Sequence, residues 1–166
     1  MPLSNAQLTF YDSRVLRLPA ETRTAYHAQV DNLVRELTRS LHGATDLRVT
    51  RVVKAGSFAK YTILRRTSVD PVDVDLVFYI AGRDATRETL ATLTATLERL
   101  LVTIYPTKAV EDFTIQRKAL TVAFVGSGLS VDVVPVLEDA RRPGYGWQFD
   151  IRDGSRVQTC APCQIQ

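Results

Sequence analysis

The sequence of 166 residues has the length of one globular domain, and hydrophobic residues make up 45% of it, which is enough to form a core and excludes a disordered chain. The formal net charge of +3 suits anionic partners such as nucleotides, but no concentrated basic run is present, so nucleic acid is not expected as a partner. No apolar run has the length of a signal peptide or a bilayer-spanning helix, so we expect a cytoplasmic protein without a membrane partner.

An amphipathic helix is predicted from about Glu21 to His42, because apolar residues recur there every three or four positions and Gly43 follows. The next segment, from Leu47 to Lys54, alternates and is rich in β-branched residues, which is typical of a strand. This strand runs into the pair Gly56 and Ser57.

A short helical turn is expected from Ser57 to about Leu64, because serine is a good N-cap residue, and the polar residues 65–71 are expected to form a loop. A strand is then predicted over VDVDLVFYI, residues 72–80. Its even-numbered residues are all apolar, so Asp73 and Asp75 lie together on the other face.

Residues Asp84 to Ile104 carry leucines at helical spacing and are predicted to form a second amphipathic helix. The segments Glu111 to Ile115 and Ala119 to Val125 are typical of the two strands of a hairpin. A further strand, LSVDVVPVL at residues 129–137, places Asp132 among apolar residues. The remainder of the chain is rich in glycine and charge, and we expect loops with one short strand.

The chain has two cysteines, Cys160 and Cys163, in a Cys-Ala-Pro-Cys segment. This spacing fits a redox pair or half of a zinc site. A redox pair normally opens a helix after a strand, and a zinc site needs two further ligands, whereas His27 and His42 lie far away in the first predicted helix. We therefore expect no functional role for the pair.

The aspartates form a candidate metal site. Asp73 and Asp75 are two residues apart on one strand, so their side chains point the same way and can converge on one ligand. If the strand of Asp132 were a neighbour, three negative groups would share a small volume, which is costly without a cation or a bound proton. Magnesium fits this set, because it takes oxygen ligands and completes its shell with water and substrate phosphates.

The Gly56 and Ser57 pair is a candidate phosphate site. A turn that leaves a strand and opens a helix exposes backbone N–H groups to an anion. Ser57 adds a hydroxyl, and Lys60 and Thr62 offer further donors. The turn would hold a triphosphate while the metal site polarises the α-phosphate and lowers the pKa of an attacking hydroxyl.

The order of GSFAKYT, DVD and VDVVPV resembles the polymerase-β-like nucleotidyltransferase superfamily, and is most similar to the bacterial cGAS/DncV-like nucleotidyltransferases, or CD-NTases. The likeness extends over roughly residues 5–160. It implies an α+β fold with a mixed β-sheet flanked by helices, in which residues 1–166 are the catalytic domain and a C-terminal helical domain is missing. It also implies nucleoside triphosphate substrates, pyrophosphate release and two Mg²⁺ ions, with Mn²⁺ as an alternative.

Carried over position by position, the resemblance implies that Ser57 contacts the donor phosphates and that Asp73 and Asp75 hold the metals. Asp132 would complete the metal site and help to deprotonate the acceptor hydroxyl. The expected activity is the joining of nucleoside triphosphates into a cyclic or linear oligonucleotide second messenger in anti-phage defence, with a downstream effector or regulator from a defence operon as a further partner.

Two alternatives stay open. The first is transfer of a nucleotide to RNA or protein, as in CCA-adding enzymes or antitoxins, although antitoxins usually have a shorter gap between Gly-Ser and Asp-x-Asp. The second is a non-catalytic fragment that binds a nucleoside triphosphate and Mg²⁺. We further expect Tyr79 and Trp147 to fill hydrophobic space. Lys108, Arg117 and Lys118 are expected to be surface charges of a hairpin.

Overall fold

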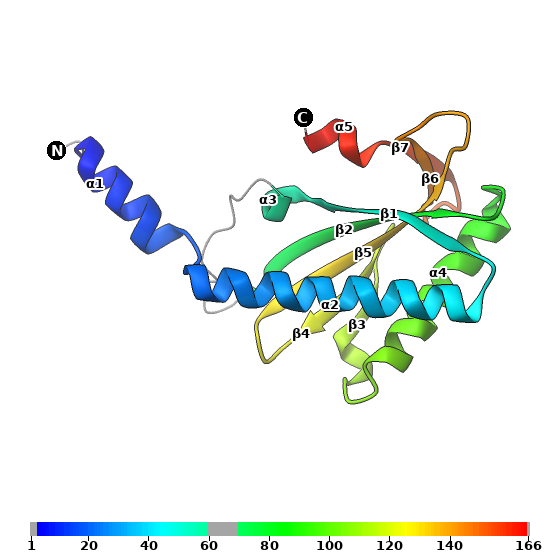
Figure 1. The fold of residues 1–166 in the computed structure, drawn as a ribbon, viewed down its shortest axis with the longest axis horizontal. Helices are drawn as coiled ribbons and strands as arrows, with labels where there is room; N and C mark the ends of the chain where they lie inside the picture. Colours follow the sequence, from blue (N-terminus) through cyan, green and yellow to red (C-terminus); the bar gives the residue numbers. More distant parts are fainter. Residues whose placement is uncertain (1–2, 60–69, 166) are drawn as a thin grey trace.

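The computed structural model describes residues 3–59 and 70–165, which form a mixed β-sheet with two long helices packed on one face (Figure 1). This architecture confirms the predicted α+β fold with a mixed sheet flanked by helices. The described part of the chain has seven strands: β1 (Arg48–Ala55), β2 (Val72–Ala81), β3 (Phe113–Ile115), β4 (Leu120–Phe124), β5 (Leu129–Glu138), β6 (Gly146–Phe149) and β7 (Arg156–Thr159).

The sheet has the strand order β1-β2-β5-β4-β3, and β6 pairs with both β5 and β7. Strands β2 and β5 are parallel, whereas the other pairs are antiparallel. The predicted hairpin of β3 and β4 is confirmed, with Phe113 opposite Val122. Because β2 and β5 are both ten residues long and pair along most of their length, they form the centre of the sheet.

Two amphipathic helices, α2 (Ala20–Ala44) and α4 (Arg87–Ile104), cover one face of the sheet, as the apolar spacing predicts. Each buries a stripe of leucines, and full burial of one leucine is worth about 1.5 to 3 kcal/mol. The hydroxyl of Thr86 caps α4 by accepting from the N–H of Thr89 at 3.1 Å. Gly43 lies within the last turn of α2 rather than beyond its end.

The opposite face of the sheet carries a smaller apolar cluster that includes Val77 and Tyr79 of β2, Val136 of β5 and Ala161. Tyr79 is fully buried, which agrees with its predicted role in the core. Trp147 is partly buried against the main core, and the guanidinium of Arg156 lies 4.6 Å from the centre of its ring. The aromatic residues singled out in the sequence therefore fill space inside the fold.

The N-terminal segment is helical, which the apolar pattern does not predict. Helix α1 (Asn5–Phe10) continues as the π-helical segment η1 (Tyr11–Leu16), and neither buries a residue. Figure 1 shows α1 projecting away from the sheet. The signal for its start is local, because Ser4 and Gln7 form a capping box.

The end of the chain is more regular than the loops and single short strand expected from the sequence. It forms β6, β7 and the short helix α5 (Ala161–Ile165), and a disulfide joins Cys160 to Cys163. The prediction fails because strands of four residues are too short to show a period.

Two short helices complete the described chain: α3 (Gly56–Ala59) and the 3₁₀ turn η2 (Val110–Asp112). Helix α3 overlaps the start of the turn predicted from Ser57, while the rest of that turn and most of the following loop lie outside the described residues. Across residues 3–59 and 70–165, no helix combines the length and apolar character needed to cross a membrane.

Candidate active site

Three acidic side chains come from the two central strands. Asp73 and Asp75 lie at the start of β2, and Asp132 lies on β5 directly opposite Asp75 in the parallel register. Residues opposite one another on neighbouring strands project from the same face, and the strands lie about 4.8 Å apart. The structure therefore brings the three predicted acids onto one face at one end of the sheet, opposite the face that α2 and α4 cover.

The charges of these acids interact. The pKa of Asp75 is raised above its usual range, first because burial disfavours the carboxylate and then because the negative charges of Asp132 and Asp73 lie nearby. Asp73 is exposed, and Asp132 is half-buried. Among the described residues no group of three or more His, Cys, Asp or Glu side chains is already arranged to hold a metal ion, so the acids are neighbours rather than a closed cage.

Gly56 lies directly beside Asp75. Strand β1 ends at Ala55, which is opposite Asp75 in the antiparallel pair, and Gly56 turns the chain into α3 with φ at +65°. A side chain at this position would collide with Oδ2 of Asp75. Only glycine combines this backbone conformation with so close an approach of a carboxylate.

Of the other three predicted phosphate-binding residues, the structure describes the backbone of Ser57. The backbone of Ser57 lies in α3, immediately after Gly56, so the Gly-Ser turn and the acids are brought together. Lys60 and Thr62 lie outside the described residues. Their predicted contacts with phosphate stay predictions.

A hydrogen-bond chain that the sequence reasoning missed ends on Asp132. The hydroxyl of Thr121 on β4 donates to Oδ1 of Asp132 at 2.6 Å, and Nε2 of Gln116 donates to the same hydroxyl at 2.7 Å. Thr121 lies opposite Asp132 in the β4–β5 register. Pairing the predicted hairpin with β5 in the correct register would have placed Thr121 opposite Asp132 and predicted this contact.

A second group missed in the sequence flanks the Gly-Ser turn. The ammonium of Lys54, on β1, lies 2.7 Å from Oδ1 of Asp31, and the ring of His27 lies 4.3 Å from that of Phe58 in α3. The pKa of His27 is lowered, mainly by burial and then by the positive charge of Lys54. An imidazole and a lysine therefore lie beside α3.

The hairpin residues expected to be ordinary surface charges have structural partners. The guanidinium of Arg117 donates to the fully buried carboxylate of Asp150, and that ion pair ties the β3–β4 hairpin to the turn after β6. Lys108 donates to the carbonyl of Ala123, and its ammonium lies 4.3 Å from the centre of the Phe124 ring. These contacts give both cations a role in packing.

The sequence profile of the Second Messenger Oligonucleotide or Dinucleotide Synthetase domain, SMODS, matches residues 1–164. The chain belongs to the SMODS family. The match spans the candidate site, from Gly56 to Asp132, and confirms the resemblance to CD-NTases drawn from the sequence.

Two SMODS relatives from Escherichia coli illustrate the likeness. The chain is 57% identical over 166 residues to the CBASS oligonucleotide cyclase CdnC of strain KTE188, covering all of this chain and 53% of the relative. It also resembles the solved structures of CdnC from strain MS115-1, one in a complex with HORMA-deltaN and one with ATP. Both structures have a TM-score of 0.67, with 30% and 31% identity, and cover 95% of this chain and 47% and 48% of CdnC.

The chain thus spans about half the length of the relatives it matches. SMODS enzymes of the CD-NTase type are metal-dependent nucleotidyltransferases. The position of the acids near the start of β2 and β5 is compatible with that chemistry, because carboxylate oxygens are the ligands that hard divalent cations prefer.

Proposed function

We propose that residues 1–166 form the catalytic domain of a nucleotidyltransferase that joins nucleoside triphosphates into a cyclic or linear oligonucleotide second messenger in anti-phage defence. The observation that carries this proposal is the placement of Asp75 opposite Asp132 and against Gly56. An acid pair and a glycine turn at one end of a sheet combine a place for a cation with a place for a phosphate.

The donor set fits Mg²⁺, with Mn²⁺ as an alternative. We propose that Asp73, Asp75 and Asp132 hold two such ions, because all three offer carboxylate oxygens and a cation would offset the burial and the repulsion that raise the pKa of Asp75. When bound, the ions supply charge that polarises the α-phosphate and lowers the pKa of the attacking hydroxyl.

Phosphate binding and acceptance of the hydroxyl proton are assigned to residues of this chain. The backbone at Gly56 and Ser57, with Lys60 and Thr62, would hold the donor phosphates, since successive N–H groups of a turn form an anion-binding concavity. Thr121 would orient Asp132, whose carboxylate would accept the proton of the acceptor hydroxyl.

The ATP-bound CdnC structure supports nucleoside triphosphates as the substrates, and the complex of CdnC with HORMA-deltaN supports a protein partner such as the regulator expected from a defence operon. We propose the same substrate class and the same kind of partner for this chain because it belongs to the same family.

The first experiment incubates the protein with labelled nucleoside triphosphates and Mg²⁺. We expect small oligonucleotide products that resist phosphatase, and their loss in Asp73→Ala and Asp75→Ala. Asp84→Ala is the matched control, because this aspartate is exposed after β2, and it should retain the products. Products only after addition of RNA or protein would instead indicate transfer to a macromolecule. Nucleotide binding without product would indicate a non-catalytic fragment.

We expect Thr121→Val to weaken Mn²⁺ binding about 10- to 100-fold, as for other groups that orient metal ligands. Valine keeps the shape of threonine but removes the hydroxyl that donates to Asp132. Thr121→Ser keeps the donor and should bind Mn²⁺ within about threefold of the parent. Both variants are measured by calorimetric titration, and equal affinities for valine and serine would remove Thr121 from the proposed site.

A further inference from the structure

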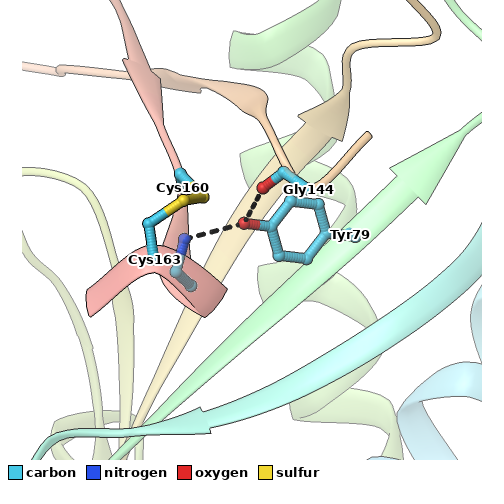
Figure 2. Close-up of a disulfide and its surroundings, with 5 residues drawn as sticks. Tyr79, Gly144, Cys160 and Cys163 are labelled. Atoms are coloured by element: carbon cyan, nitrogen blue, oxygen red, sulfur yellow. Dashed lines mark hydrogen bonds between the residues drawn. A yellow bond between two sulfur atoms is a disulfide. The ribbon is translucent and has the colours of Figure 1, made fainter. Parts of the chain in front are cut away.

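The Cys160–Cys163 disulfide lies where solvent reaches it. Cys163 is exposed, Cys160 is partly exposed, and the bond closes around the first residues of α5, which starts at Ala161 (Figure 2). Accessible sulfurs are a requirement for exchange with a small thiol, whereas a fully buried disulfide reacts slowly.

Between the two cysteines, Ala161 is anchored to the sheet. It is 3% exposed within the small apolar cluster, and its N–H donates to the hydroxyl of Tyr79 at 2.9 Å. That hydroxyl in turn donates to the carbonyl of Gly144 at 3.0 Å, and Figure 2 shows Tyr79 and Gly144 beside the disulfide. The disulfide thus encloses Ala161, a residue that attaches α5 to β2.

Helix α5 depends on contacts with the sheet, at Ala161 and along β1. With five residues it is far shorter than a helix that is stable in water without tertiary contacts. At the start of the helix, the N–H of Cys163 donates to the carbonyl of Cys160 at 3.2 Å, and the disulfide joins the same two residues. Opening the bond would therefore free the backbone on both sides of Ala161.

Release of α5 would expose the guanidinium of Arg51, which is buried beside Tyr79. The guanidinium of Arg51 lies 4.5 Å from the centre of the Tyr79 ring, on the strand β1 against which α5 packs. Its Nε and Nη2 atoms are buried and make no hydrogen bond to any described residue. Buried polar groups without a partner lose the hydrogen bonds that water would supply, so exposure of this surface is favourable for Arg51.

We propose that Cys160 and Cys163 are a reversible thiol–disulfide centre whose oxidised form clamps α5 onto Tyr79 and whose reduced form releases it. The reductant is a low-molecular-weight thiol or a dithiol. Its thiolate attacks one sulfur and forms a mixed disulfide, while the other cysteine leaves as a thiolate and takes up a proton. A second thiol then resolves the mixed disulfide, so two thiols of the reductant become a disulfide as two cysteine thiols form.

The test combines redox titration with hydrogen exchange on the 166-residue protein. Mixtures of reduced and oxidised dithiothreitol set the redox poise, and alkylation followed by mass spectrometry reports the state of the cysteines. We expect no alkylated cysteine at the oxidising end and two at the reducing end. The Ala161 amide should exchange at least about tenfold faster in the reduced protein, because it loses its buried acceptor.

Two variants and one control separate the clamp from a passive disulfide. Cys160→Ser with Cys163→Ser, and separately Tyr79→Phe, should exchange fast at Ala161 under both conditions. Tyr11→Phe removes the hydroxyl of an exposed tyrosine and should keep the redox difference. The proposal is overturned if both cysteines are alkylated at every poise, or if Ala161 exchanges equally in the oxidised and reduced parent.

Discussion

Asp75→Asn is expected to abolish product formation and to weaken Mn²⁺ binding by about 100-fold or more, which exceeds the effect of groups that only orient metal ligands. Asparagine keeps the size of aspartate but removes the charge at the position opposite Asp132. Calorimetric titration with Mn²⁺ measures the affinity, and Asp84→Asn is the control at an exposed position. Parent-like affinity in Asp75→Asn would remove this residue from the metal site.

The same substitution should stabilise the fold when no divalent ion is present. Because the pKa of Asp75 is raised in the folded protein, its ionisation reduces the free energy of unfolding. This cost is absent below the ordinary pKa of aspartate and grows as pH rises through the raised pKa. At pH 7 we therefore expect the melting temperature of Asp75→Asn to exceed that of the parent, with no gain at pH 3. Thermal unfolding at both pH values measures the difference, and a gain that persists at pH 3 would contradict this cause.

Gly56→Ala is expected to destabilise the protein by about 1 to 2 kcal/mol and to weaken Mn²⁺ binding at least tenfold. Alanine is strained at φ +65°, and its methyl group would displace the carboxylate of Asp75. Thermal unfolding and Mn²⁺ titration measure the two effects.

The matched control is Gly126→Ala. Gly126 has open space around its Cα and no positive φ, so alanine should change neither stability nor Mn²⁺ affinity. If Gly56→Ala lowered stability but bound Mn²⁺ like the parent, the close approach of Gly56 to Asp75 would serve folding alone.

The sequence contains enough information for the central strands and long helices. Alternation in 72–80 and 129–137 places the acids of both segments on one face of each strand, and the leucine spacing defines α2 and α4. Whether Asp75 and Asp132 meet depends on the parallel pairing of β2 with β5. That pairing is a tertiary contact between distant segments, and no local pattern encodes it.

Other features were missed because their signals are short or arise from several segments. The N-terminal helix buries no residue, so it has no core-facing stripe, and α5 has five residues that include Pro162. Thr121 becomes recognisable only when β4 and β5 are paired in register, and His27 only when α2 is packed beside α3.

Strand β5 has a consequence for the order in which the molecule is assembled. It joins β2 and β4, and β6 adds to its far end, so it must pair with partners synthesised both before and after it. Non-local parallel pairing slows folding, because the intervening chain must first be closed into a loop. A nascent chain that has reached only β2 carries two of the acids without the third, so the proposed acidic site is complete only after the centre of the sheet has formed.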